Sequence, residues 1–109
     1  MYISITGLKT KGLFASIRFW FLTVPAFKAA RNANGIILCE SKSQNGYHHT
    51  LTVWKSKANM IEYISSPVHL KAKKAFPSIA VGKVIGYQCD AIPSWEQAIQ
   101  AWNEKAKPV

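Results

Sequence analysis

Segments with a two-residue hydrophobic period alternate along this chain with segments of helical period, in an order that few folds accommodate. In residues 2–8, Ile3 and Ile5 fall on one face and the residues between them on the other, as in a half-buried strand. Further strand-like runs cover residues 36–40, 47–54 and 81–89. Helical spacing covers residues 13–33, residues 58–65, a segment that starts at Pro67 and a segment that starts after Ser94.

This order of strand, helix, strand, strand, two helices, strand and helix is the ferredoxin-like pattern with a C-terminal extension. The chain has 109 residues, the length of one ordinary domain, so residues 1–109 are expected to form a single domain. We therefore predict an α+β fold, with a four-stranded antiparallel sheet and helices on one face. The other face of such a sheet must meet solvent, a ligand or a second copy of the chain.

Single residues indicate where these elements bend, turn and end. Pro25 lacks a backbone donor, so the first helix is expected to kink or restart there. That helix should end before the turn at residues 32–35, with Gly35 as a left-handed cap. The pair Asn45-Gly46 predicts a hairpin turn between two strands.

Two of the helices also carry signals at their N-termini. Ser66 is a candidate N-cap, and Pro67 after it occupies the first helical position. Ser94 followed three residues later by Gln97 predicts a capping box at the start of the C-terminal helix.

The composition limits the kind of partner and the compartment. A net charge of +9 favours anionic partners, such as nucleic acid, acidic lipid or a carboxylated ligand. Cys39 and Cys89 are far apart and in no metal-ligand spacing, so neither a disulfide framework nor a zinc site is expected. Residues 13–27 are apolar, but Arg18 interrupts them and they fall short of the ~20 residues needed to span a bilayer. We expect a soluble cytoplasmic protein without a membrane span.

The strand at residues 47–54 has two chemically different faces. The more aliphatic face, expected to lie against helices, carries Tyr47, His49, Leu51 and Val53. The amphipathic face carries His48, Thr50, Thr52 and Trp54. Hydroxyl, imidazole and indole groups suit a partly wet cavity or a subunit interface, and Tyr2, Ser4 and Thr6 would join that surface.

His69, near the start of the helix that begins at Pro67, is a candidate general base or axial haem ligand, because a neutral imidazole serves both roles. Packing or capping at a helix start is the alternative role. His48 and His49 point to opposite faces of their strand, so the pair cannot chelate one metal ion.

Several reaction classes have no support in the sequence. The chain contains neither the nucleophile elbow of hydrolases nor a glycine-rich phosphate loop, and its five acidic residues are scattered. Hydrolysis and phosphoryl transfer are therefore disfavoured, which leaves binding, or redox chemistry carried by a cofactor or by an oxygen-reactive substrate. The RNA-recognition module shares the order of elements, but residues 47–54 lack its stacking aromatic motif.

Residues 49–56 with their Thr-Leu-Thr-Val-Trp core resemble the central motif of the monooxygenase-like dimeric α/β-barrel superfamily, which includes antibiotic-biosynthesis monooxygenases. A closer likeness is to the spheroidene-monooxygenase-like branch, where an aromatic N-terminal helix such as Phe19-Trp20-Phe21 is expected. The residues after the motif that extend the likeness are Met60, Tyr63, Ser66, His69 and Ala72.

The resemblance implies a homodimer whose two sheets pack face to face, with an apolar pocket between sheet and helices in each subunit. It implies that Trp54 lines the pocket, that Tyr63 lies on a covering helix and that His69 faces the ligand or an iron atom. His49 matches a motif position and is a second candidate for holding a cofactor, although strand alternation puts it on the face opposite Trp54. A bound haem and the absence of any cofactor are equally compatible with the sequence.

We therefore expect a small hydrophobic or aromatic ligand in the pocket, with an oxygen-dependent monooxygenation as the candidate activity. The candidate catalytic residues are His69, Trp54 and Tyr63. The alternative is a ligand-binding or structural homodimer of the same fold without catalysis, in which these aromatic residues fill the interface.

Overall fold

The order of elements in the computed structural model, which describes residues 1–109, matches the order predicted from the sequence. β1 (Tyr2–Thr10) leads into α1 (Leu13–Arg31), and β2 (Ile36–Gln44) and β3 (Tyr47–Trp54) form a hairpin. The remaining elements are α2 (Lys57–Ile64), α3 (Pro67–Ile79), β4 (Ala80–Gln88), α4 (Trp95–Lys105) and the short β5 (Lys107–Pro108).

β1 lies in the middle of one antiparallel sheet with the strand order β2-β3-β1-β4-β5. Its residue Ile3 is paired with Val53 of β3 on one side and with Tyr87 of β4 on the other. The predicted α+β ferredoxin-like sheet is confirmed, and β5 adds two residues alongside β4.

The turn predicted at Asn45-Gly46 and the capping box predicted at Ser94 are both present in the structure. Asn45 and Gly46 both have positive φ angles, 52° and 80°, as a tight β2–β3 hairpin requires. The side chain of Ser94 accepts a hydrogen bond from the backbone N–H of Gln97, and the side-chain oxygen of Gln97 accepts one from the backbone N–H of Ser94, so the capping box of α4 is complete.

Of the two possibilities predicted at Pro25, a kink or a restart, the restart does not occur. α1 is one continuous helix of 19 residues. Phe19 on one side of Pro25 and Ala26 on the other are buried in the domain. This tertiary packing holds the helix together across the backbone donor that proline lacks.

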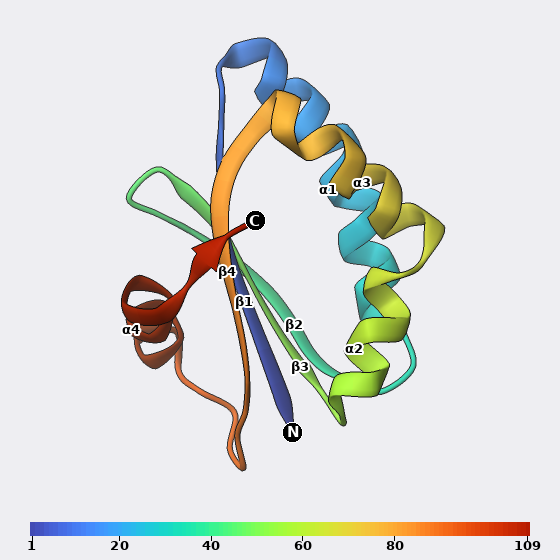
Figure 1. Ribbon diagram of the computed structural model, residues 1–109, viewed down its shortest axis with the longest axis vertical. Helices are drawn as coiled ribbons and strands as arrows, with labels where there is room; N and C mark the ends of the chain where they lie inside the picture. Colours follow the sequence, from blue (N-terminus) through green and yellow to red (C-terminus); the bar gives the residue numbers. More distant parts are fainter.

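The helices lie on both faces of the sheet rather than on one. Figure 1 shows α1, α2 and α3 on one side of the sheet and α4 alone on the other. The expectation of helices on one face holds for α1–α3, whereas the C-terminal extension folds back over the opposite face. With helices on one face only, the other apolar face of the sheet would be exposed to water. The apolar side of α4 covers part of that face.

The core under α4 is built from the aliphatic faces of β1 and β3. Ile3, Ile5, Leu51 and Val53 are almost completely buried there, and Trp102 of α4 packs against them. The indole N–H of Trp102 donates a hydrogen bond of 2.9 Å to the backbone carbonyl of Lys83. A β-carbon at Gly7 would collide with the Trp102 ring, so glycine is needed where α4 crosses β1.

α1 is long and apolar enough to cross a membrane when length and composition alone are considered. In the structure, one side of α1 packs onto the sheet and α3 through Phe19, Ala26 and Ala30. Because these side chains belong to the folded core, length and composition alone are weak evidence that α1 spans a membrane.

Candidate functional site

A cavity of about 480 Å³ lies between the sheet and the helices α1–α3. Hydrophobic residues make up 16 of its 24 lining residues, so the space is largely apolar. Its floor is the amphipathic face predicted from strand alternation. The floor residues from β1 and β3 include Tyr2, Ser4, Thr6, Thr50, Thr52 and Trp54.

The three covering helices each contribute part of the cavity wall. α1 supplies Phe19, Leu22 and Ala26, which follow one another at helical spacing. α2 supplies Tyr63, and α3 supplies His69. The three residues that the resemblance placed at the pocket, Trp54, Tyr63 and His69, therefore line one cavity.

These three aromatic side chains are in contact with one another. The rings of Trp54 and Tyr63 are stacked, with centroids 5.4 Å apart and planes inclined by 28°. The Tyr63 ring then meets the His69 ring edge to face, at 5.3 Å and 70°. The result is a continuous aromatic wall along one part of the cavity.

A hydrogen bond to α1 fixes Tyr63 in this wall. Its hydroxyl donates to the backbone carbonyl of Ala26 over 2.7 Å, which joins α2 to α1. Burial raises the pKa of Tyr63 to about 12, and the nearby Cys39 thiol adds to the increase. Tyr63 is therefore a neutral phenol whose proton is already engaged, which suits a positioning role better than proton transfer.

Three buried polar atoms near the wall have no hydrogen-bond partner: Nε1 of Trp54, Nδ1 of His69 and Oγ of Ser66. Trp54 is only 1% exposed, so water does not readily satisfy its indole N–H. A buried donor left without a partner costs about 1–3 kcal/mol. A ligand that carries an acceptor would remove this cost when it binds.

Ser66 departs from its predicted role in one respect. It is the N-cap residue of α3 by position, and Pro67 follows it as expected. Its side chain makes no capping hydrogen bond, however, and its Oγ is one of the three unpartnered atoms. The hydroxyl is thus free of the backbone bond that a serine in this position normally makes.

Burial lowers the pKa of His69, and the positive charge of Lys73 lowers it further, against an opposing backbone interaction with Ile64. The imidazole is therefore predominantly neutral near pH 7. A neutral imidazole with an unpartnered nitrogen can accept a proton or ligate a metal ion.

His49 does not line the cavity. It is 2% exposed and lies on the opposite face of the sheet, where its ring meets the edge of Trp102 at 4.7 Å. Its Nδ1 lies 3.2 Å from the backbone carbonyl of Thr6. Because neighbouring residues in a strand point to opposite faces, His49 is separated from Trp54 and His69 and is not a candidate for holding a cofactor in this cavity.

We expect the protein to lose stability as the pH falls below about 6.5, the ordinary pKa of histidine. Burial lowers the pKa of both His49 and His69, so each binds a proton more readily in the unfolded chain. The contribution of these two histidines to the free energy of unfolding is complete above their pKa in the unfolded chain. It decreases as the pH falls through their lower pKa in the folded protein. Carboxylates titrate at lower pH, so urea unfolding between pH 7.5 and 5.5 isolates the two histidines. If a His49→Asn/His69→Asn double variant lost as much unfolding free energy over this pH range as the parent does, the prediction would be wrong.

The inner face of α1 is the part of the cavity that sequence reasoning missed. Phe14, Ile17, Phe21 and Val24 define the helical period in the sequence, but all four are exposed in the structure. The cavity side is formed instead by Phe19 and its neighbours. One feature of the sequence could have indicated this inner face: the helix is apolar on every side, which is typical of a helix with two buried or binding faces.

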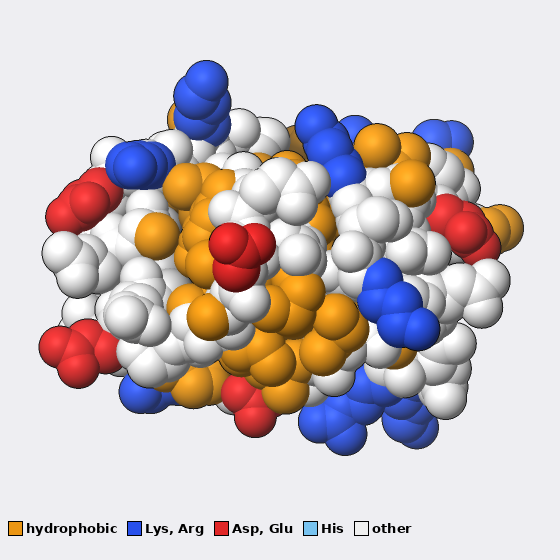
Figure 2. All heavy atoms as spheres, turned by 90° about the horizontal axis from the view of Figure 1, so that it is seen from below, with side chains coloured by type: hydrophobic (Ala, Val, Ile, Leu, Met, Phe, Trp, Pro, Cys, Tyr) orange, Lys and Arg blue, Asp and Glu red, His pale blue; other side chains and the backbone are white.

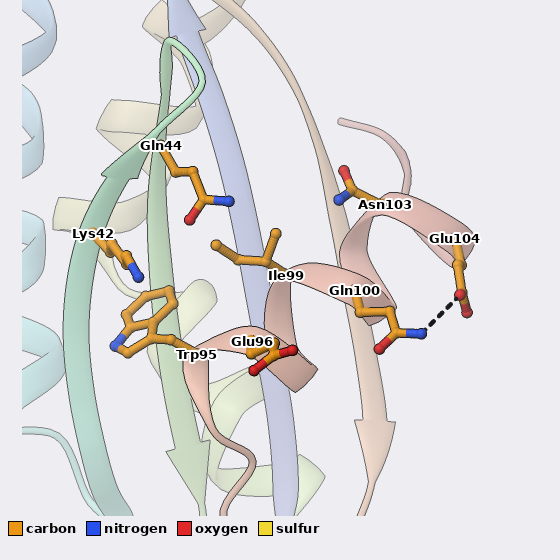
Figure 3. Close-up of a pocket in the computed structure, with 8 residues that line it drawn as sticks. All are labelled: Lys42, Gln44, Trp95, Glu96, Ile99, Gln100, Asn103 and Glu104. Atoms are coloured by element: carbon orange, nitrogen blue, oxygen red, sulfur yellow. Dashed lines mark hydrogen bonds between the residues drawn. The ribbon is translucent and has the colours of Figure 1, made fainter.

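A second depression, of about 560 Å³, lies between α4 and the edge of β2 and is shown in Figure 3. Only two of its eight lining residues are hydrophobic, and one hydrogen bond of 3.2 Å joins Gln100 to Glu104 within it. None of the predicted site residues lies there. No three His, Cys, Asp or Glu side chains come close enough together in the structure to hold a metal ion.

The fold is similar to solved structures of small oxygenase-like proteins. A candidate antibiotic biosynthesis monooxygenase from Deinococcus radiodurans matches with a TM-score of 0.73 and 18% identity, over 86% of this chain and 97% of that one. SnoaB from Streptomyces nogalater, a cofactor-independent oxygenase, matches with a TM-score of 0.68 and 10% identity, over 85% and 97%.

A dimeric ferredoxin-like protein of unknown function from Jannaschia sp. CCS1 matches with a TM-score of 0.70 and 15% identity, over 81% of this chain and 98% of that one. No protein-family model and no curated protein matches the sequence. At these identities the likeness is one of fold. The chain shares the ferredoxin-like α+β fold of these solved structures.

Proposed function

We propose that this protein binds a flat, largely apolar aromatic ligand in the cavity under α1–α3 and oxidises it with dioxygen. The observation that carries the proposal is the aromatic wall, where buried nitrogen atoms of Trp54 and His69 lack partners at a largely apolar cavity. A planar ligand with one or two polar atoms supplies those partners. The similarity in fold to SnoaB, a cofactor-independent oxygenase, supports oxidation as the reaction.

Each residue of the wall has a separate part in this proposal. The indole N–H of Trp54 donates to a carbonyl or phenolate oxygen of the ligand, while the stacked rings of Trp54 and Tyr63 orient its plane. The neutral imidazole of His69 accepts a proton from the ligand carbon or hydroxyl that is oxidised. The apolar lining excludes water from the reacting atoms.

The reaction balances without a further reductant when the ligand supplies the electrons. A CH₂ group next to a carbonyl-bearing aromatic system loses two hydrogen atoms and gains one oxygen atom from dioxygen, which forms a ketone. The second oxygen atom leaves with the two hydrogen atoms as water. Anthrone, a planar tricyclic ketone with such a CH₂ group, is a suitable probe because its carbonyl can accept the hydrogen bond from Trp54.

The residues present also fit a haem. His69 offers an unpartnered buried nitrogen of the type that ligates haem iron, and Lys73 of the same helix lines the cavity and offers a cation for a propionate. A haem held in this way would supply oxygen activation at its iron. The wall residues would retain their positioning role, and His69 would hold the iron instead of moving a proton.

Anthrone titrated into the protein without oxygen tests the binding step. We expect saturable quenching of tryptophan fluorescence, and a Trp54→Phe variant should bind roughly five- to hundredfold more weakly, because about 1–3 kcal/mol is lost with one buried hydrogen-bond donor. Admission of air should then consume dioxygen and form anthraquinone. Lys71→Ala, an exposed change on α3, is the matched control and should behave as the parent.

The outcomes of this titration separate the two functional classes. Binding without any enzyme-dependent uptake of dioxygen would make the protein a non-catalytic binding module. An unchanged affinity in Trp54→Phe would show that the indole N–H does not face the ligand, and the proposed site would be wrong.

We propose further that the protein is a cytoplasmic homodimer. A similar solved structure is described as dimeric, which supports the oligomeric state. The rings of Trp54 lie beneath helices of the same chain and are 1% exposed, which argues for a cavity role of this residue over an interface role. Because α4 covers part of the outer sheet face, a face-to-face dimer would use the sheet surface that α4 leaves open.

A further inference from the structure

α1 carries a second apolar face, on the side opposite the cavity. The exposed hydrophobic side chains are Leu13, Phe14, Ile17, Phe21 and Val24, with Phe14 83% and Phe21 77% exposed. At 3.6 residues per turn these five positions fall within roughly a third of the helix circumference. We call this surface the outer face of α1.

From this surface we infer that the protein docks on anionic membranes, with α1 lying flat in the headgroup region and its outer face inserted between the lipids. A helix with large aromatic and aliphatic side chains on one side and cations around them is typical of interfacial binding. The 19 residues of α1 extend over about 28 Å, ample for several lipid headgroups.

The charges around the outer face favour lipid over a second copy of this chain. Arg18, Lys28 and Arg31 are exposed on α1, and no Asp or Glu precedes Glu40 in the sequence. Two copies that met through α1 would bring these cations together with no carboxylate of α1 to pair with them. Phosphate groups of an anionic bilayer supply the missing negative charges, and the net charge of +9 adds to the attraction.

Another hydrophobic area, at the end of the molecule seen in Figure 2, is less suited to an anionic surface. An acidic side chain projects from the middle of this area. Contact with anionic lipid would place that carboxylate against phosphate groups, which repel it. The outer face of α1 is therefore the surface that combines exposed aromatic residues with cations alone.

Docking through α1 would bring the cavity close to the bilayer. Phe19, Leu22 and Ala26 of the same helix line the cavity, so one helix separates the cavity from the docked surface. A hydrophobic ligand dissolved in the membrane would have a short path into the protein. This consequence rests on the proposed function, whereas the docking itself requires no ligand and no oxidation.

Flotation with lipid vesicles tests the docking. We expect the parent to float with vesicles of phosphatidylcholine containing 30 mol% phosphatidylglycerol. It should bind pure phosphatidylcholine vesicles at least tenfold more weakly, because they lack the negative charge that attracts the cations of α1. A Phe14→Ser/Phe21→Ser variant should bind the anionic vesicles roughly tenfold or more weakly, because burial of each exposed phenyl ring in lipid contributes to the affinity. Val81→Ser/Ile92→Ser removes exposed apolar side chains elsewhere and should bind as the parent.

Two double variants with the same net charge distinguish the effect of the cations on α1 from the effect of the overall charge. Arg18→Gln/Lys28→Gln and Lys105→Gln/Lys107→Gln each remove two positive charges, from α1 and from the α4 side respectively. We expect the first pair to weaken binding several-fold more than the second, and salt to weaken the binding of both. Equal losses, or an undiminished affinity of Phe14→Ser/Phe21→Ser, would overturn the proposed docking through α1.

Sedimentation equilibrium of the same variants tests the alternative that a second copy of this chain covers the outer face of α1. If Phe14→Ser/Phe21→Ser turned a dimer into a monomer, the outer face would be a dimer interface and the membrane proposal would be wrong. An unchanged mass together with lost flotation supports it. Neither measurement uses anthrone or dioxygen, so a failure of the proposed oxidation leaves this test intact.

Discussion

Replacement of His69 by Ala is expected to slow the protein-dependent oxidation of anthrone by roughly 10²–10⁴-fold, the usual contribution of a positioned general base. The ring of His69 lies in the cavity wall, and its pKa is lowered by burial, so that the parent imidazole is ready to accept a proton at pH 7. Initial rates of dioxygen uptake at saturating anthrone measure the effect.

The affinity for anthrone separates a proton-transfer role from a packing role. The stacking of Trp54 on Tyr63 and the hydrogen bond from Tyr63 to Ala26 do not involve His69, so binding in His69→Ala should change much less than the rate. A His69→Gln variant keeps much of the side-chain volume but cannot act as a base, and it should be as slow as His69→Ala. A fast His69→Gln variant would show that the residue only fills space.

The same variant also tests the haem branch. Haemin titrated into the parent should give a saturable Soret shift if His69 binds iron, and His69→Ala should abolish it. Lys71→Ala on the exposed side of α3 should retain the shift. The absence of a specific shift in the parent would remove haem from the proposed function and leave the cofactor-free oxidation.

Replacement of Trp102 by Ala is expected to lower the free energy of unfolding by about 3–5 kcal/mol, the range for large aromatic residues in cores. Trp102 is 6% exposed and packs against Ile3, Leu51 and their neighbours under α4. The change also leaves the Lys83 carbonyl without the hydrogen bond that the indole donates. Urea unfolding followed by circular dichroism measures the loss.

Trp95→Ala, on the first turn of the same helix, is the matched control for this variant. Trp95 is only partly buried and also borders the open depression beside β2, so its removal should cost markedly less. Equal losses for the two substitutions would mean that α4 is not anchored through Trp102. A loss below about 1 kcal/mol at Trp102, the size expected for surface positions, would have the same meaning.

Short-range signals in the sequence predicted the local structure well. The Asn45-Gly46 turn and the Ser94 capping box depend on neighbouring residues alone, so a linear sequence contains all the information they need. Strand alternation also separated Trp54 from His49 correctly. The restart at Pro25 does not occur because buried contacts with residues far along the chain keep α1 continuous through it.

Long-range features were harder to predict because they depend on which layer each element joins. The apolar stripe of α4, with Ala98 and Trp102, is equally compatible with either face of the sheet. In the same way, the exposed Phe14 and the buried Phe19 look alike in composition, since α1 is apolar all round. The motif correctly predicted the three aromatic residues Trp54, Tyr63 and His69 of the cavity wall. The residues of α1 that line the cavity were not predicted.

The central position of β1 sets the time at which the sheet can be completed during synthesis. β1 leaves the ribosome first, but its two neighbours, β3 and β4, end only at Trp54 and Gln88. Until residue 88 has emerged, one edge of this central strand keeps free backbone donors and acceptors, which can pair with another chain. A nascent chain stalled before β4 is therefore expected to be the species most dependent on chaperones.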